Sequence, residues 1–138
     1  MASKPENTFI AGVHKHMLQS GLYHLKINMP LVGGIPDCWY SGKRADLWVE
    51  YKYVPALPIR EHTKVHVNLS ELQTLWLGRR YYEGRNVAVV LGHSKGGVLL
   101  EKLEWGKSFT TTEILERTMT RKELAEYIIR FTDGPVKQ

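Results

Sequence analysis

Cysteine is almost absent from this sequence, since Cys38 is the only one among 138 residues. A single cysteine excludes an intramolecular disulfide and fits a reducing compartment. The sequence also lacks an apolar run of the length that a membrane helix needs, which is about 20 residues. Its polar N-terminal start is unlike a secretory signal peptide. We therefore expect an intracellular, cytoplasmic protein without a membrane partner.

Internal repeats, low-complexity tracts and linker-like stretches are missing too. The chain is therefore expected to form one domain over residues 1–138, long enough to bury a hydrophobic core. Hydrophobic residues make up 43% and charged residues 24%, which is ordinary for a globular domain. The formal net charge of +5 permits an anionic partner but does not identify one.

The first half of the chain contains the pattern of a β-hairpin. Residues 45–54 alternate between apolar and polar side chains, and residues 35–40 give a second, shorter strand signal. The polar residues 41–44 between them are typical of a hairpin turn. Antiparallel pairing around this turn would bring Asp37 and Glu50 opposite one another.

Three charged side chains of this hairpin could form one site. Successive strand side chains point to opposite faces, so Glu50 and Lys52 share a face, with Asp37 beside them. Two carboxylates suit Mg²⁺, and a nearby lysine can position a water or neutralise charge on a phosphate. The alternative is a solvated Glu50–Lys52 pair, with Asp37 as a turn residue.

The order Pro36-Asp37 followed by Glu50-Tyr51-Lys52 resembles the PD-(D/E)XK nuclease superfamily. The resemblance implies an α/β (α+β) fold with a central mixed β-sheet flanked by helices, a restriction-endonuclease-like core. It also implies cutting of nucleic-acid phosphodiesters with Mg²⁺ or Mn²⁺. The metal ligands would be Asp37, Glu50 and the backbone carbonyl of Tyr51, and Lys52 would orient or activate the attacking water.

A first helix is predicted over residues 4–19, because Ser3 and Glu6 have the spacing of a capping box. Many members of the resembled superfamily carry a glutamate on this helix that points at the metal site. Glu6 is the matching position, so it is a candidate catalytic residue. Its capping role explains it equally well.

A second helix is predicted from Leu69 to about Glu83, with Leu72, Leu75, Trp76 and Tyr82 packing inward. Its Leu-Ser-x-x-Gln start resembles the phage-type branch of the superfamily, which includes Holliday-junction-resolvase-like and VRR-NUC domains. That likeness implies a place for Gln73 at the rim of the active site. Ser70 and Gln73 also have capping-box spacing, so a purely structural role stays open.

The rest of the chain supplies further elements. Residues 59–68 are either a short edge strand or an ordered loop. The other predicted elements are strands over 23–29, 86–92 and 98–105, a short helix over 112–117, and a C-terminal helix from Thr120 that packs on the core. Six basic residues are expected to contact phosphates: Arg60, Lys64, Arg79, Arg80, Arg85 and Lys95.

These patterns favour a metal-dependent DNA endonuclease that binds duplex or branched DNA as a homodimer. Within that class we favour a site-specific phage enzyme of the homing type, and a Holliday-junction or other structure-specific resolvase is the alternative. A non-catalytic nucleic-acid-binding module is the competing class. An RNA-directed enzyme is also compatible with the sequence.

Overall fold

The sheet is built around β3 (Asp46–Tyr53), the strand whose sequence alternates most clearly. A computed structural model describes residues 3–29 and 31–135 of the chain. β3 pairs antiparallel with β2 (Cys38–Ser41), as the hairpin pattern predicts, and parallel with β5 (Val87–His93).

Two further strands complete this sheet in the described part of the chain. β1 (Tyr23–Lys26) pairs with β2, and β6 (Gly96–Leu100) pairs with β5, so the order is β1-β2-β3-β5-β6. β3–β5 is the parallel pair, and the other three pairs are antiparallel. The sheet is therefore mixed, as expected.

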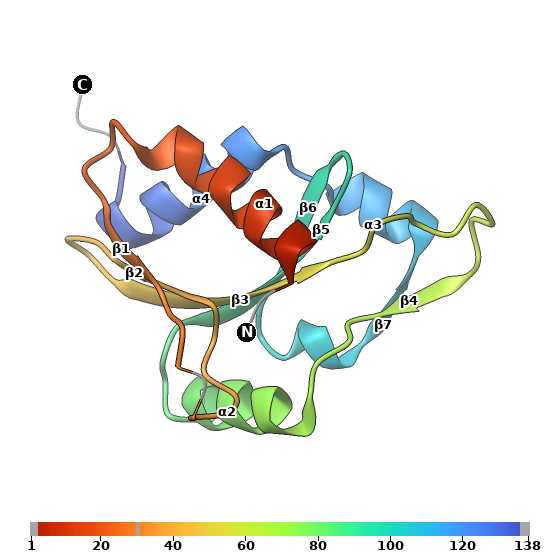
Figure 1. Cartoon of the computed structure of the whole chain (residues 1–138), viewed down its shortest axis with the longest axis horizontal. Helices are drawn as coiled ribbons and strands as arrows, with labels where there is room; N and C mark the ends of the chain where they lie inside the picture. Colours follow the sequence, from red (N-terminus) through yellow and green to blue (C-terminus); the bar gives the residue numbers. More distant parts are fainter. Residues whose placement is uncertain (1–2, 30, 136–138) are drawn as a thin grey trace.

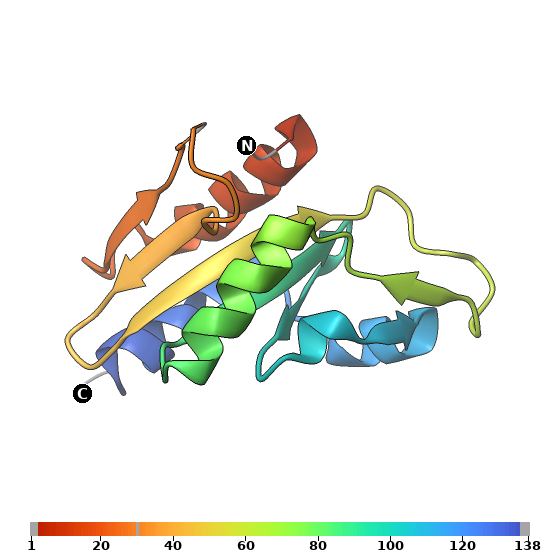
Figure 2. The same ribbon diagram turned by 90° about the horizontal axis from the view of Figure 1, so that it is seen from below.

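Helices cover both faces of the sheet (Figures 1 and 2). α1 (Lys4–His14) and α4 (Arg121–Asp133) pack on one face, and α2 (Glu71–Tyr82) lies on the other. Successive side chains of β3 point alternately to the α1–α4 face and to the α2 face of the sheet. Val49 and Tyr51 belong to the core beneath α1 and α4, whereas Trp48 packs with the core on the α2 side. Glu50 and Lys52, one step out of phase with Tyr51, therefore face α2.

α2 buries a different face from the one predicted. Leu72, Leu75 and Tyr82 are 57%, 48% and 77% exposed, so their assignment to the core was wrong. Leu77 is fully buried, and Gln73 lies on the same side of the helix one turn earlier. Apolar residues occur all round this helix, so periodicity alone does not identify the face that meets the sheet.

The helix predicted over 4–19 and the strand predicted over 98–105 both end early. After His14 the chain tightens into a 3₁₀ turn (Lys15–Met17), and the Ser20 hydroxyl donates to the Met17 carbonyl at 2.6 Å. β6 stops at Leu100 because Lys102 and Leu103 adopt positive φ angles of 53° and 67°, outside the strand region.

A second, two-stranded sheet lies beside the main one. β4 (Lys64–His66) pairs with β7 (Ser108–Thr110), and α3 (Thr111–Arg117) follows β7. The segment 59–68 thus contains a short strand, whose partner lies in a region without a strand signal. No helix in residues 3–29 and 31–135 is long and apolar enough to span a membrane.

Candidate active site

Asp37 and Glu50 are brought together by the register of the β2–β3 hairpin. Cys38 pairs with Val49, so Asp37, one residue earlier, comes level with Glu50. The Tyr51 backbone N–H donates to Asp37 Oδ2 at 2.8 Å, which fixes the Asp37 carboxylate against β3. Both acidic side chains are buried, with 8% of Asp37 and 3% of Glu50 exposed.

Glu50 is held on one side and left open on the other. Gln73 Nε2 donates to Glu50 Oε2 at 2.9 Å, and Lys52 Nζ lies 3.7 Å from the same oxygen. Glu50 Oε1 is buried and has no hydrogen-bond partner among the described residues. A buried carboxylate oxygen without a donor is costly, so this atom is available to a ligand that supplies positive charge.

The electrostatics of the pair point the same way. Burial, with a further contribution from the Asp37 charge, raises the pKa of Glu50 to about 8, while Lys52 opposes the shift. Burial also raises the pKa of Asp37, although the Tyr51 N–H counteracts it. Two carboxylates that share a buried site resist ionising together, and a bound cation would offset that repulsion.

A cavity of about 130 Å³ adjoins the two carboxylates. Its walls are Asp37, Glu50, Gln73 and the connection between β1 and β2, at residues 27–29 and 32–35. That connection packs on the start of α2. Gly34 has a φ of 89°, and a Cβ there would lie 2.5 Å from the Leu72 carbonyl oxygen. Glycine is therefore required for this wall to close against the helix.

Gln73 caps α2 and contacts Glu50 with the same side chain. Its Oε1 accepts the Ser70 N–H at 2.9 Å, which completes the capping box, and its Nε2 reaches Glu50. The two roles that the sequence left open are therefore compatible. The cap orients the amide so that its N–H₂ group points at the carboxylate.

Glu6 stands further from the pair. It forms the predicted capping box, in which its carboxylate accepts the Ser3 N–H at 3.1 Å. α1 lies on the opposite face of the sheet from Glu50, yet the charge of Glu6 contributes weakly to the raised pKa of Glu50. Glu6 is therefore within electrostatic range of the site.

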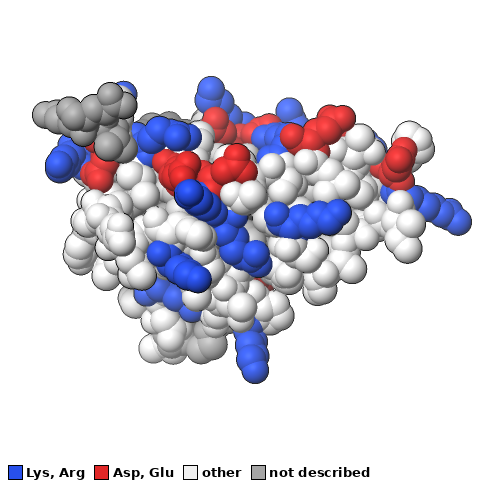
Figure 3. Space-filling model, turned by 90° about the horizontal axis from the view of Figure 1, so that it is seen from above, with Lys and Arg blue, Asp and Glu red and all other residues white. Residues whose placement is uncertain are grey.

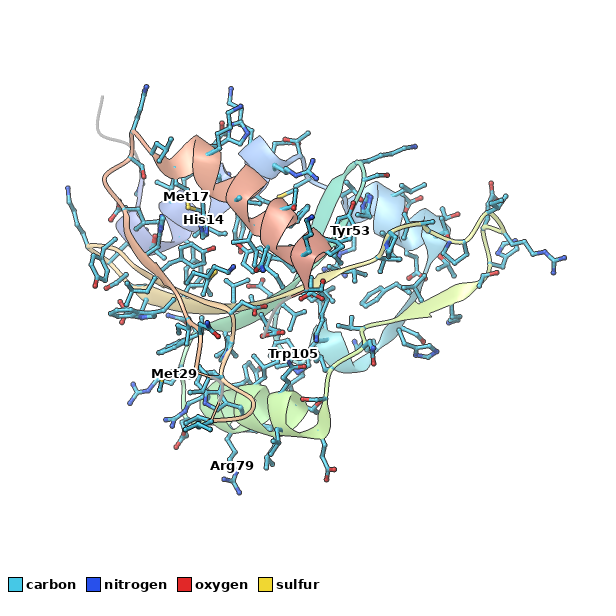
Figure 4. All side chains as sticks on the ribbon, viewed as in Figure 1. His14, Met17, Met29, Tyr53, Arg79 and Trp105 are labelled. Atoms are coloured by element: carbon cyan, nitrogen blue, oxygen red, sulfur yellow. The ribbon has the colours of Figure 1, made fainter. Side chains whose placement is uncertain are left out.

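The six predicted phosphate-binding residues are distributed over separate segments. Arg60 and Lys64 belong to the loop before β4 and to β4 itself, and Lys95 lies in the β5–β6 turn. Arg79 points away from the sheet (Figure 4), and Arg80 pairs with Glu83 at 3.2 Å. Arg85 follows α2. Over α1 and α4, basic side chains are interspersed with acidic ones (Figure 3).

Sequence reasoning missed the wall residues of the cavity and the support behind Tyr51. The Tyr51 hydroxyl is 2.6 Å from that of Tyr40, which lies 2.7 Å from His14 Nε2. Burial, together with the charges of His24 and Lys26, lowers the pKa of His14 to about 4. Tyr40 and Tyr51 lie on adjacent strands and point to the same face of the sheet. That shared face is the one sequence signal from which their contact could have been predicted.

The donor set fits a hard divalent cation with few protein ligands. No group of three or more His, Cys, Asp or Glu side chains converges within residues 3–29 and 31–135. The site instead offers two carboxylates and nearby backbone. Mg²⁺ is commonly held by one or two carboxylates and keeps several waters, so this set suits it better than it suits zinc.

Comparison with known proteins adds a fold relationship. No protein-family model matches the sequence, and a search of curated proteins gave no match. Among solved structures, the Holliday junction resolvase Hjc of Archaeoglobus fulgidus, an archaeal hyperthermophile, matches 88% of this chain and 98% of its own. The TM-score is 0.56 and the sequence identity is 15%, so the likeness concerns the fold. The chain has the α+β fold of an archaeal Holliday junction resolvase, and the predicted fold class is confirmed.

Proposed function

We propose that the chain is a divalent-metal-dependent nuclease that acts on DNA. One observation carries the proposal: Glu50 is buried beside Asp37 at a cavity, its Oε1 has no partner among the described residues, and Lys52 Nζ lies 3.7 Å from its Oε2. A site built only for stability would not place two acidic side chains together in a buried position, because ionising both costs desolvation energy and mutual repulsion. The resolvase fold supports the nuclease interpretation.

The acidic residues would hold Mg²⁺ or Mn²⁺, with the Tyr51 carbonyl as a third ligand. When bound, the metal supplies Lewis-acid stabilisation of the charge that develops on the phosphate. The Tyr51 N–H holds Asp37 in place, and the Gln73 amide holds one oxygen of Glu50, so that Oε1 stays directed to the ligand. The two carboxylates are thus fixed before substrate arrives.

Lys52 would act on the water or the phosphate. Its ammonium, 3.7 Å from Glu50 Oε2, is close enough to orient an attacking water or to neutralise charge in the transition state. Glu6 is kept as a second-rank candidate for the same site. The six basic residues remain candidates for phosphate contacts outside it: Arg60, Lys64, Arg79, Arg80, Arg85 and Lys95.

The fold favours branched DNA over the homing-type alternative. The matching structure is a Holliday junction resolvase, so we place a four-way junction first among substrates and a specific duplex sequence second. Resolution of a junction requires two strands to be cut, and a homodimer supplies two active sites. We therefore keep the homodimer as part of the proposal.

The test is a parallel cleavage assay with Mg²⁺ on a four-way junction, supercoiled plasmid and linear phage DNA. Preferential cutting of the junction supports the proposal, and discrete fragments from linear DNA would favour the homing type instead. DNA binding without cutting would indicate a non-catalytic module. Asp37→Asn is the control, because it removes a charge while retaining an acceptor for the Tyr51 N–H. Titration of Mn²⁺ against thermal stability checks metal binding without reference to activity.

A further inference from the structure

A row of aromatic side chains crosses the sheet beside the acidic pair. Trp39 and Trp48 lie directly opposite one another on β2 and β3, with ring centroids 5.9 Å apart and an angle of 29° between the ring planes. Tyr23 of β1 meets Trp39 edge-on at 5.7 Å, and Trp76 of α2 meets Trp48 at 5.3 Å. The Arg80 guanidinium lies over the Trp76 ring, 5.5 Å from its centroid. The aromatic row is therefore continuous and ends at a cation.

The aromatic row lies on the same face of the sheet as the two carboxylates. Side chains two positions apart on a strand point to the same face. Trp39 is two residues after Asp37, Trp48 is two residues before Glu50, and the antiparallel register brings both pairs level. The row is thus one cross-strand step along the hairpin from the acidic pair. This step is about 7 Å at the usual rise of a strand, a distance that one nucleotide can span.

The aromatic row is open to solvent at its β1 end. α2 lies over the middle of the sheet and leaves β1 and β2 uncovered (Figure 2). Tyr23 is 56% exposed, and Leu25, which lies opposite Trp39 on the same face, is exposed as well. The three tryptophans of the row are each partly buried. Large apolar side chains gathered on an uncovered face of a sheet are typical of a binding surface.

Two cavities flank the aromatic row, and both combine an indole with arginine. The first, of about 310 Å³, lies between the β1–β2 connection and α2, and its lining includes Trp76, Arg79 and Arg80. The second, of about 370 Å³, is lined in part by Trp48 and Arg85. Each cavity also contains one carboxylate, and the one in the first cavity pairs with Arg80. Arg79 and Arg85 form no ion pair in the described part of the chain, so both can meet a phosphate.

We propose that the aromatic row binds an unpaired nucleotide of the DNA substrate, next to the phosphodiester that lies at the acidic pair. Every base has a π-face, so an indole can hold a base by stacking whatever the sequence, while arginines beside it meet the phosphates. The bases of a duplex are already stacked on their neighbours and are not free to lie on this row. The substrate class that fits is therefore branched DNA with unpaired nucleotides at the branch. That the neighbouring phosphodiester is the one cut rests on the proposed function.

Binding measured in EDTA tests the aromatic row apart from any cutting. The probes are a labelled oligothymidylate of about 12 nucleotides and a blunt duplex of the same length. Trp39→Leu keeps an apolar side chain but removes the indole, so it should weaken oligothymidylate binding by about 10-fold or more, and Trp39→Phe should restore most of the loss. Binding of the duplex depends on phosphate contacts and should change little. Equal losses for both probes, or no loss for either, would overturn the proposal.

Tyr23→Ala and Tyr82→Ala are a matched pair of variants, because both tyrosines are exposed and only Tyr23 belongs to the aromatic row. Tyr23→Ala should weaken oligothymidylate binding, and Tyr82→Ala should leave it unchanged. Thermal melts show whether each variant is folded, and the exposed position of Tyr23 keeps the test decisive where Trp39→Leu does not fold. Equal effects of the two tyrosine variants would contradict the assignment of the row.

Cleavage with Mg²⁺ tests the link between the aromatic row and the acidic pair. A four-way junction with unpaired thymidines at the branch should be cut faster than a fully paired one, next to an unpaired nucleotide, and Trp39→Leu should remove the preference. Cutting that ignores unpaired nucleotides would overturn this proposal and leave the nuclease function standing. A protein that cuts neither junction, yet binds oligothymidylate through Tyr23 and Trp39, would overturn the nuclease function and leave the row as a nucleotide-binding surface.

Discussion

Glu50 is the residue whose surroundings conflict most with stability. It is 3% exposed, its Oε1 has no partner in the described part of the chain, and Asp37 adds a like charge beside it. An unsatisfied buried polar group costs about 1–3 kcal/mol, and more when charged. An unmet ligand or ion is one explanation for such a group, and it is the reason for proposing a metal site here.

Glu50→Gln should therefore separate stability from function. The amide removes the charge and keeps an oxygen for Gln73, so the metal-free protein should gain about 1–3 kcal/mol of unfolding free energy. The same change should abolish cleavage and the thermal shift produced by Mn²⁺, while DNA binding at fixed salt stays largely intact. Urea unfolding, metal titration and fluorescence anisotropy measure the three effects. A Glu50→Gln protein that still cuts DNA would remove Glu50 from the metal site.

Lys52 offers a test of chemistry against charge. Lys52→Ala should lower the cleavage rate by about 100-fold or more, the range expected for a positioned acid–base or water-orienting group. Lys52→Arg should lose less but still clearly, because the guanidinium keeps the charge but is bulkier and does not give up its proton. Single-turnover rates at saturating enzyme keep any weaker DNA binding out of the comparison. Near-normal cutting by Lys52→Ala would show that Lys52 is only a strand residue.

Among the helices and strands, the sequence predicted structure best where a residue pattern fits only one local conformation. The alternation of β3 gave the faces of Glu50 and Tyr51, and the Ser70–Gln73 spacing gave the start of α2. The buried face of α2 was mispredicted, because apolar residues surround that helix and only tertiary packing selects among them. The pairing of β4 with β7 depends on contacts between distant segments, which no local pattern encodes.

The cap of α2 can be separated from its contact with Glu50. Gln73→Glu keeps a capping-box residue but places a third carboxylate beside Glu50 and Asp37. We expect a lower melting temperature without metal and a larger stabilisation by Mn²⁺ than in the unchanged chain. Gln73→Ala should lose about 1 kcal/mol in both conditions, since cap and contact are removed together. Thermal melts with EDTA and with Mn²⁺ measure both variants. Identical melts for the two variants would show that Gln73 does not act on Glu50.

For the molecule as a whole, the stability of the metal-free protein should depend on pH in a defined direction. The pKa of Glu50 is raised to about 8, so between its usual 4.5 and 8 the folded state binds more protons than the unfolded state. Stability then falls as pH rises. The lowered pKa of His14, about 4 against 6.5, acts in the opposite direction below pH 6.5. The free energy of unfolding should therefore fall as pH rises between about 6.5 and 8.

Urea unfolding of the metal-free chain across pH 6–8.5 measures this decline. Glu50→Gln should flatten the profile, and saturating Mn²⁺ should remove it because the metal competes with the proton. A profile that rises from pH 6.5 to 8 in the metal-free chain would contradict the raised pKa of Glu50.

The parallel pairing of β3 with β5 also has a kinetic consequence. Asp37 and Tyr51 are 14 residues apart and meet within a hairpin, whereas β5 joins β3 only after the chain has crossed over through residues 54–86. Closing the longer loop is the slower event. The two carboxylates therefore become neighbours before the domain is complete, and we expect Mn²⁺ to speed refolding as well as to slow unfolding. Stopped-flow refolding at several metal concentrations would detect this, and a metal effect confined to the unfolding rate would place the assembly of the acidic pair after the rate-limiting step. If Mn²⁺ does speed refolding, the cation proposed for catalysis also stabilises the transition state for folding.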